Sequence, residues 1–281
     1  MNRLSFFAAW TIVVSFAALP VRAAPGEPGG LPPGEKDAKE VLNKSPRHGE
    51  FVDVAVPGAK TPLKSYIVYP ERKDKAPVVI VIHEIFGLTD WARGVADQLA
   101  ADGFIAIAPD MLSGHGKDGG GTESYPGRDD VVQAVRKLKG DEVKADLDAV
   151  RDFGLKLPAA SGKTATVGFC WGGGQSFAYA AEQPSLDAAV VYYGTPPAAD
   201  VMEKIKAPVL GLYGGNDARV TSTVEPTTAE MKKLGKAYSP HIYDGAGHGF
   251  LRAQDLQNGA NLKAAQQAWP ETIAFLREYT K

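Results

Sequence analysis

The chain of 281 residues carries 31 lysines and arginines against 33 aspartates and glutamates, a formal net charge of −2. The cations are scattered among the acids, with no basic stripe interleaved with aromatic residues, which argues against a surface that follows a nucleic-acid backbone. The length suits one large hydrophobic core, and the single cysteine, Cys170, excludes an intramolecular disulfide.

The first 23 residues have the composition of a secretory signal peptide. Arg3 precedes an apolar, uncharged run over residues 4–19, and small residues lead to an expected cleavage point after Ala23. The run is short for a membrane span and contains hydroxyl side chains, which favours cleavage over anchoring. We therefore expect an exported protein, periplasmic or secreted, that is a monomer without membrane attachment after cleavage.

Residues 24–50 are rich in glycine, proline, lysine and glutamate and show little apolar periodicity, so we predict a flexible lead-in. Alternating apolar and polar residues at 51–56 and 63–69 predict two strands that pair antiparallel at one edge of a sheet. The folded domain is expected to span residues 51–281.

A continuous apolar run over residues 76–83 predicts a parallel strand that is covered on both faces. The sequence from Glu84 to Gly87 follows it, at the end of the strand where an open α/β sheet builds its ligand crevice. A helix over 90–101 and a strand over 104–108 come next, which predicts a right-handed crossover. The glycine-rich residues 113–128 form either a surface loop or a lid over the crevice.

The remaining apolar patterns continue the alternation of strands and helices. Strands are predicted over 164–169, 188–193, 207–213 and 238–243, and helices over 129–138, 142–155, 175–182, 227–234 and 261–279. This alternation predicts an α/β fold with a doubly wound, mostly parallel sheet and helices on both faces.

The sequence Gly168-Phe169-Cys170-Trp171-Gly172 joins a predicted strand to a predicted helix. Gly-x-Cys-x-Gly is the spacing of a nucleophile elbow, in which small neighbours let the strand and the helix approach each other. The first N–H groups of the following helix would favour a thiolate and hold a developing oxyanion. A buried structural cysteine is the alternative, but it does not need glycines at this spacing.

Asp217 and His248 follow two later predicted strands, each in a glycine-containing turn. The order nucleophile, acid, histidine is that of the α/β-hydrolase triad. Cys170 would attack a carbonyl as a thiolate, His248 would transfer the proton, and Asp217 would orient the imidazole. Asp244 is a rival acid, although its place four residues before His248 suits a turn.

A metal site is the next alternative. Four possible ligands lie in the first half of the chain: His83, Glu84, Asp110 and His115. They lack the His-x-x-x-His or paired-cysteine spacing that is typical of metal sites, so we expect neither a metal nor another cofactor.

With these residues the chain resembles the dienelactone hydrolases of the α/β-hydrolase superfamily, from about residue 51 to residue 279. The resemblance is carried by five short segments: Glu84-Ile85-Phe86-Gly87, Pro109-Asp110, Gly168-Phe169-Cys170-Trp171-Gly172-Gly173, Asn216-Asp217 and Gly247-His248-Gly249-Phe250. It implies the triad roles for Cys170, Asp217 and His248. It also implies that Glu84 lies beside the thiol and deprotonates it once substrate binds, so that the resting cysteine is weakly reactive. The oxyanion hole would come from the backbone N–H groups of Ile85 and Trp171.

The resemblance further implies two arginines that bind a substrate carboxylate. Arg252, four residues after His248, matches one of them. The segment that carries the other reads Pro-Asp-Met-Leu-Ser-Gly here and has no arginine, so Arg128 from the loop is our candidate substitute. The expected substrate is a small ester or lactone, cleaved through an acyl-enzyme by a carboxymethylenebutenolidase-like activity, but it need not be dienelactone. A binding protein without turnover and a thioesterase or acyl-transfer enzyme stay open as alternatives.

Overall fold

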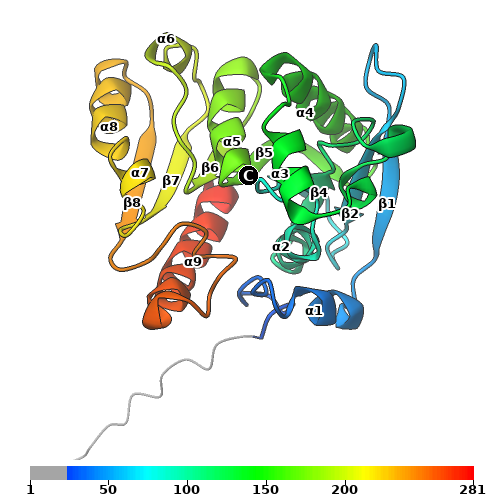
Figure 1. Ribbon diagram of the computed structural model, residues 1–281. Coiled ribbons are helices and arrows are strands. Elements are labelled where there is room, and N and C mark those ends of the chain that lie inside the picture. Colours follow the sequence, from blue (N-terminus) through cyan, green and yellow to red (C-terminus); the bar gives the residue numbers. More distant parts are fainter. Residues whose placement is uncertain (1–23) are drawn as a thin grey trace, which may run out of the picture.

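The computed structural model describes residues 24–281, and the predicted signal peptide lies outside these residues. Its centre is an eight-stranded sheet with the order β1-β2-β4-β3-β5-β6-β7-β8 (Figure 1). The strands are β1 (Gly49–Val54), β2 (Leu63–Val68), β3 (Ala76–Ile82), β4 (Ile105–Pro109), β5 (Ala160–Phe169), β6 (Ala188–Tyr192), β7 (Val209–Gly214) and β8 (Tyr238–Tyr243). β1 and β2, and β2 and β4, pair antiparallel, and all other neighbours are parallel. The predicted α/β fold and its antiparallel edge are confirmed.

Helices cover both faces of this sheet. They are α1 (Ala38–Lys44), α2 (Asp90–Ala101), α3 (Arg128–Val135), α4 (Gly140–Leu155), α5 (Trp171–Glu182), α6 (Ala199–Met202), α7 (Ala218–Thr221), α8 (Val224–Lys233) and α9 (Ala260–Tyr279). Short 3₁₀ turns lie at Lys117–Gly119, Thr122–Ser124 and Gln257–Gly259. Among residues 24–281 no helix is long and apolar enough to cross a membrane.

The side chains of β3 show how the core is divided. Val79 and Val81 point to the layer that contains α2 and α9, whereas Val78 and Ile80 point to the layer that contains α4 and α5. Successive residues of a strand face opposite sides of the sheet, so a strand that is covered on both sides needs an unbroken apolar run. This is why the sequence of β3 shows no alternation.

Residues 24–48, called here the N-terminal segment, are packed on the domain, whereas the sequence predicted a flexible lead-in over residues 24–50. Ala38 of α1 is fully buried, and α1 lies against α2 (Figure 1). Arg47 forms an ion pair with Asp97 of α2, and each side chain is only 3% exposed. Composition did not reveal this packing, because few apolar residues take part and the polar partners on α2 resemble a solvated helix face.

Candidate active site

Cys170 lies in the sharp turn between β5 and α5, with φ 55° and ψ −114°. This backbone conformation is strained for any residue other than glycine. The neighbouring glycines are required by close contacts: a Cβ atom on Gly168 would lie 1.9 Å from the carbonyl oxygen of Gly172, and one on Gly172 would lie 2.3 Å from that of Ile82. The turn therefore has the geometry of a nucleophile elbow.

The surroundings of the Cys170 thiol favour its neutral form. Burial and the charge of Glu84 raise the pKa of the thiol to about 11. The backbone N–H groups of Trp171 and Ile85, which face the sulfur, and the charge of Arg219 act in the opposite direction. The start of α5 was expected to favour a thiolate, but desolvation outweighs this effect because the charged form loses its hydration. The N–H groups of Ile85 and Trp171, which were expected to form the oxyanion hole, thus both face the sulfur of Cys170.

Asp217 and His248 come together at the carboxyl ends of β7 and β8. The Nδ1 atom of His248 and the Oδ2 atom of Asp217 are 2.5 Å apart, and the carboxylate is buried. Asp217 rather than Asp244 is thus the partner of the histidine. The Tyr193 ring packs edge-on against the imidazole, with 5.1 Å between the ring centroids. A proton on Nδ1 that is donated to Asp217 leaves Nε2 available for proton transfer.

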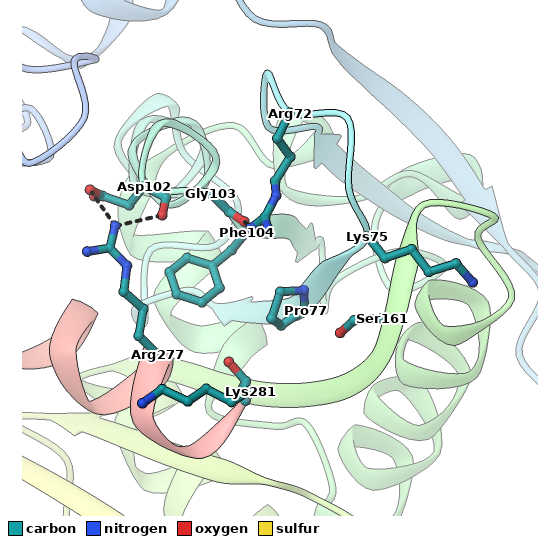
Figure 2. A pocket seen from close by; sticks show the side chains of 10 residues that line it. Arg72, Lys75, Pro77, Asp102, Gly103, Phe104, Ser161, Arg277 and Lys281 are labelled. Carbon is teal, nitrogen blue, oxygen red and sulfur yellow. Dashed lines mark hydrogen bonds and ion pairs between the residues drawn. The ribbon is translucent and has the colours of Figure 1, made fainter.

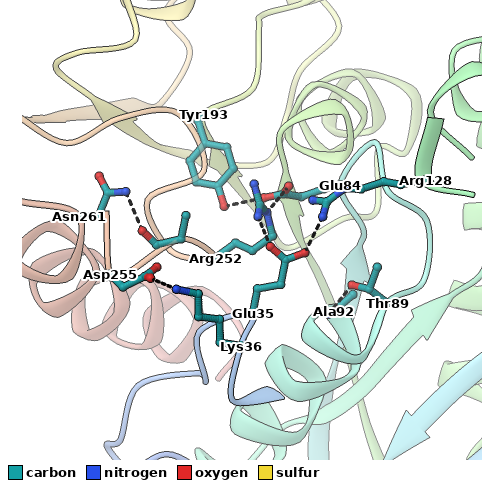
Figure 3. A network of polar contacts seen from close by, with 11 residues as sticks. Glu35, Lys36, Glu84, Thr89, Ala92, Arg128, Tyr193, Arg252, Asp255 and Asn261 are labelled. Carbon is teal, nitrogen blue, oxygen red and sulfur yellow. Dashed lines mark hydrogen bonds and ion pairs between the residues drawn. The ribbon is translucent and has the colours of Figure 1, made fainter. Parts of the chain in front are cut away.

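Glu84 follows β3 and is almost completely buried, with 3% of the residue exposed. Its carboxylate accepts hydrogen bonds from Nε of Arg252 at 2.8 Å and from the hydroxyl of Tyr193 at 3.1 Å (Figure 3). A buried carboxylate needs such partners, because it has lost its hydration. These two contacts fix the carboxylate of Glu84 at a place from which it raises the pKa of the thiol.

Arg252 and Arg128 were predicted to bind the carboxylate of a substrate. In the structure both contact a carboxylate of the chain, that of Glu35. Arg252 also donates to Glu35 of the N-terminal segment, and Arg128 contacts the same carboxylate at 3.2 Å (Figure 3). Both guanidinium groups lie over the ring of Phe86, at 3.6 Å from its centroid for Arg128 and 5.0 Å for Arg252. Their role in substrate binding stays a prediction, and in the structure both contact an acidic group of the chain itself.

A cavity of about 510 Å³ opens at Cys170. It is lined by Ile85, Arg136, Cys170, Trp171, Gly174, Gln175, Tyr193, Thr195 and Arg219. Arg136, at the end of α3, and Arg219, on α7, are its charged side chains, and neither forms an ion pair with a carboxylate of residues 24–281. Sequence reasoning missed both. The proximity of Arg219 to Asp217 in the chain was the available signal, whereas nothing in the sequence of the helix predicted over residues 129–138 distinguishes Arg136.

Residues 113–128 are tied to the end of β4. The carboxylate of Asp110 accepts hydrogen bonds from both the backbone N–H and the hydroxyl of Thr122, each at 2.7 Å. Buried His83 interacts with the N–H group of Met111 at 3.3 Å. Asp110 and His83, two of the possible metal ligands, thus form hydrogen bonds with backbone N–H groups of the chain that follows β4. Within residues 24–281, no group of three or more histidine, cysteine, aspartate or glutamate side chains is placed to hold a metal ion.

A second cavity of about 430 Å³ lies at the opposite end of the parallel strands, near the starts of β3 and β5 (Figure 2). Its lining includes four cations: Arg72, Lys75, Arg277 and Lys281. Arg72 and Arg277 already donate to the backbone carbonyl groups of Gly103 and Asp102 at 3.0 Å. The lining contains no cysteine or histidine, whereas the cavity at Cys170 contains the single cysteine of the chain.

A mostly parallel sheet with a nucleophile elbow after β5, an acid after β7 and a histidine after β8 defines an α/β-hydrolase. The family model described as the dienelactone hydrolase family matches residues 63–280. The chain belongs to this family of hydrolases that act on ester and lactone bonds.

Known proteins of similar sequence and structure agree with this assignment. A candidate carboxymethylenebutenolidase of Salmonella typhimurium is 31% identical over 237 residues, which cover 80% of this chain and 86% of the relative. The crystal structure of a candidate dienelactone hydrolase from Klebsiella pneumoniae has a TM-score of 0.71 and 29% identity, and covers 83% of this chain and 100% of the other. An acylaminoacyl peptidase from Pyrococcus horikoshii shares the fold, with a TM-score of 0.66, 14% identity, and coverage of 87% of this chain and 44% of its own.

Proposed function

We propose that the protein cleaves small carboxylic esters or lactones through an acyl-enzyme on Cys170. The supporting observation is the position of the thiol, which lies in an elbow turn with the N–H groups of Ile85 and Trp171 facing the sulfur. The hydrogen-bonded pair of Asp217 and His248 supplies the group that moves protons.

The proposed reaction begins with loss of the thiol proton to Glu84, because a thiol with a pKa of about 11 is not ionised at neutral pH. The sulfur then forms a bond to the carbonyl carbon, and the carbonyl oxygen becomes an oxyanion held by the two N–H groups. Collapse of this intermediate breaks the ester bond, and the proton that Glu84 took passes to His248, which protonates the leaving alkoxide. Water then attacks the acyl-enzyme with His248 as the base. The bond between the carbonyl carbon and the sulfur breaks and releases the acid, and His248 gives its proton to the thiolate, which restores the thiol.

Detection of the acyl-enzyme tests the proposal. Purified protein is mixed with p-nitrophenyl acetate, a neutral lactone or cis-dienelactone, quenched in acid, and analysed by peptide mass spectrometry. We expect one acyl group on the peptide that contains Cys170, and the single cysteine makes the assignment unambiguous. No acylation by any of the three, with no turnover, would favour a binding protein. Transfer of the acyl group to an added thiol or alcohol in preference to water would favour an acyl-transfer enzyme.

The cavity size and its two unpaired arginines favour a small substrate with an acidic group near the reacting carbonyl. We predict that Arg136→Gln raises KM for cis-dienelactone, which carries a carboxylate, by roughly tenfold, because a charge-assisted hydrogen bond contributes about 1.5 kcal/mol. KM for a neutral lactone should change less than about twofold. Steady-state kinetics measure both values. Lys137→Gln removes the neighbouring charge, which does not line the cavity, and serves as the control. Equal changes for both substrates in Arg136→Gln would contradict the assignment.

We also propose that the protein acts outside the cytoplasm, because its first 23 residues have the order of a signal peptide. N-terminal sequencing of the protein recovered from the exported fraction should begin at Ala24. A chain that keeps its first residues and remains in the cytoplasm would contradict export.

A further inference from the structure

Two guanidinium groups converge on one carboxylate beside Glu84, and that carboxylate belongs to the chain itself. Glu35 pairs with Arg252 through one oxygen and with Arg128 through the other (Figure 3). Two arginines around one carboxylate are an arrangement that proteins use to bind acidic ligands. Here a carboxylate of the chain itself stands where an acidic ligand would stand in such an arrangement.

Glu35 is held in this place by the backbone around it. Its N–H group donates to the carbonyl oxygen of Arg252 at 2.9 Å, and the side chain of Gln254 donates to the carbonyl oxygen of Pro32 at 2.9 Å. Lys36 pairs with Asp255 (Figure 3). These contacts join the N-terminal segment to the turn that follows His248, so Glu35 is not a mobile surface side chain that reached the arginines by chance.

The match to the family begins at residue 63, so Glu35 comes from outside the matched range. It nevertheless reaches the catalytic groups through one intermediate residue. Arg252 donates from Nε to Glu84 and from Nη1 to Glu35, and thus bridges the two carboxylates. A change at Glu35 can therefore reach Glu84 through Arg252.

We propose that Glu35 is a specificity-determining and positioning residue. It occupies the acid-binding site between Arg252 and Arg128 and so excludes an acidic group of the substrate from that side. It also keeps Arg252 in contact with Glu84. The proposal builds on the hydrolase function proposed above. It leaves Arg136 and Arg219, in the cavity at Cys170, as the cations that a substrate acid can reach.

The physical consequence concerns charge. With Glu35 present, the negative charges of Glu84 and Glu35 offset the positive charges of Arg252 and Arg128. In Glu35→Gln the neutral amide cannot offset the second cation, so an anion entering the crevice meets an unpaired guanidinium. A neutral molecule of the same size meets no such change.

Alkylation of Cys170 tests this without any need for turnover. Iodoacetate and iodoacetamide have the same reactive carbon and differ in charge, and the protein has one cysteine to modify. We expect Glu35→Gln to raise the ratio of the iodoacetate rate to the iodoacetamide rate by about fivefold, in line with the loss of two partly exposed ion pairs. Glu40→Gln is the matched control, because it removes the same charge from an exposed pair with Lys44 in the same segment.

A second variant should change the ratio of the two alkylation rates in the opposite direction. Arg128→Gln, at a half-exposed position, leaves more of the negative charge of Glu35 uncompensated, so the ratio should fall below that of the wild type. The double variant should lie between the two single variants. Thermal melting establishes that each variant is folded.

The outcomes separate this inference from the proposed function. An unchanged ratio in folded Glu35→Gln, or a rise equal to that of Glu40→Gln, would overturn the role of Glu35. Failure to form an acyl-enzyme would instead count against the hydrolase mechanism, while the alkylation ratio would still report on the acid-binding site. For an active enzyme, Glu35→Gln should also lower KM for cis-dienelactone severalfold, with little change for a neutral lactone.

Discussion

Replacement of Cys170 by alanine should lower kcat for ester hydrolysis by about 10⁴-fold or more, because no other group at the elbow can form the acyl bond. Alanine keeps the Cβ atom, so the strained turn at φ 55° is neither relieved nor worsened. The fold should therefore persist, and the loss should be chemical. Initial rates with p-nitrophenyl acetate, measured beside melting curves of both proteins, check this.

Chemical modification provides an independent control for that result. Complete alkylation of wild-type protein by iodoacetamide changes only one cysteine and should reduce the rate to a similar extent. A Cys170→Ala protein that hydrolyses the ester as fast as the wild type would remove the cysteine from the mechanism. Activity that survives alkylation but not mutation would indicate that the substitution damages the site in another way.

Glu84→Gln should slow turnover and at the same time make the Cys170 thiol easier to ionise. Turnover should fall by on the order of 10³-fold, because the thiol loses the base that takes its proton. The pKa of the Cys170 thiol should at the same time fall below about 11, because the charge of Glu84 is one of the two causes that raise it. The hydroxyl of Tyr193 can still donate to the amide oxygen, and Arg252 keeps Glu35 as a partner.

Two measurements separate these effects. The pH dependence of iodoacetamide alkylation reports the pKa of the thiol, and steady-state kinetics report turnover. A more reactive thiol together with slower turnover is the combination that a base role requires, and mere loosening of the site would not produce it. Undiminished turnover in Glu84→Gln would remove the catalytic role of this carboxylate.

Much of the active-site layout is local in sequence. The apolar run of β3, the glycines around Cys170 and the turns that carry Asp217 and His248 each place a side chain at the carboxyl end of a parallel strand. Because these ends meet at one edge of the sheet, the order of strands along the chain predicts that Cys170, Asp217 and His248 lie on the same side of the molecule. Short-range patterns were therefore enough to predict the fold class and the candidate triad.

The charge environment of the site could not be obtained in the same way. Glu35 and Arg252 are 217 residues apart in the chain, and the cavity takes Arg136 and Arg219 from two separate helices. The raised pKa of Cys170 likewise results from burial by groups that are remote in sequence.

The sequence by itself thus determined the strands, the elbow and the residues that carry the proposed chemistry, because backbone conformation and apolar periodicity depend on near neighbours. Only the tertiary structure decided that the N-terminal segment is packed, which arginines are already paired and which face the cavity. The physical reason is that charge pairing and desolvation depend on distances through space, and a side chain's neighbours along the chain do not set these.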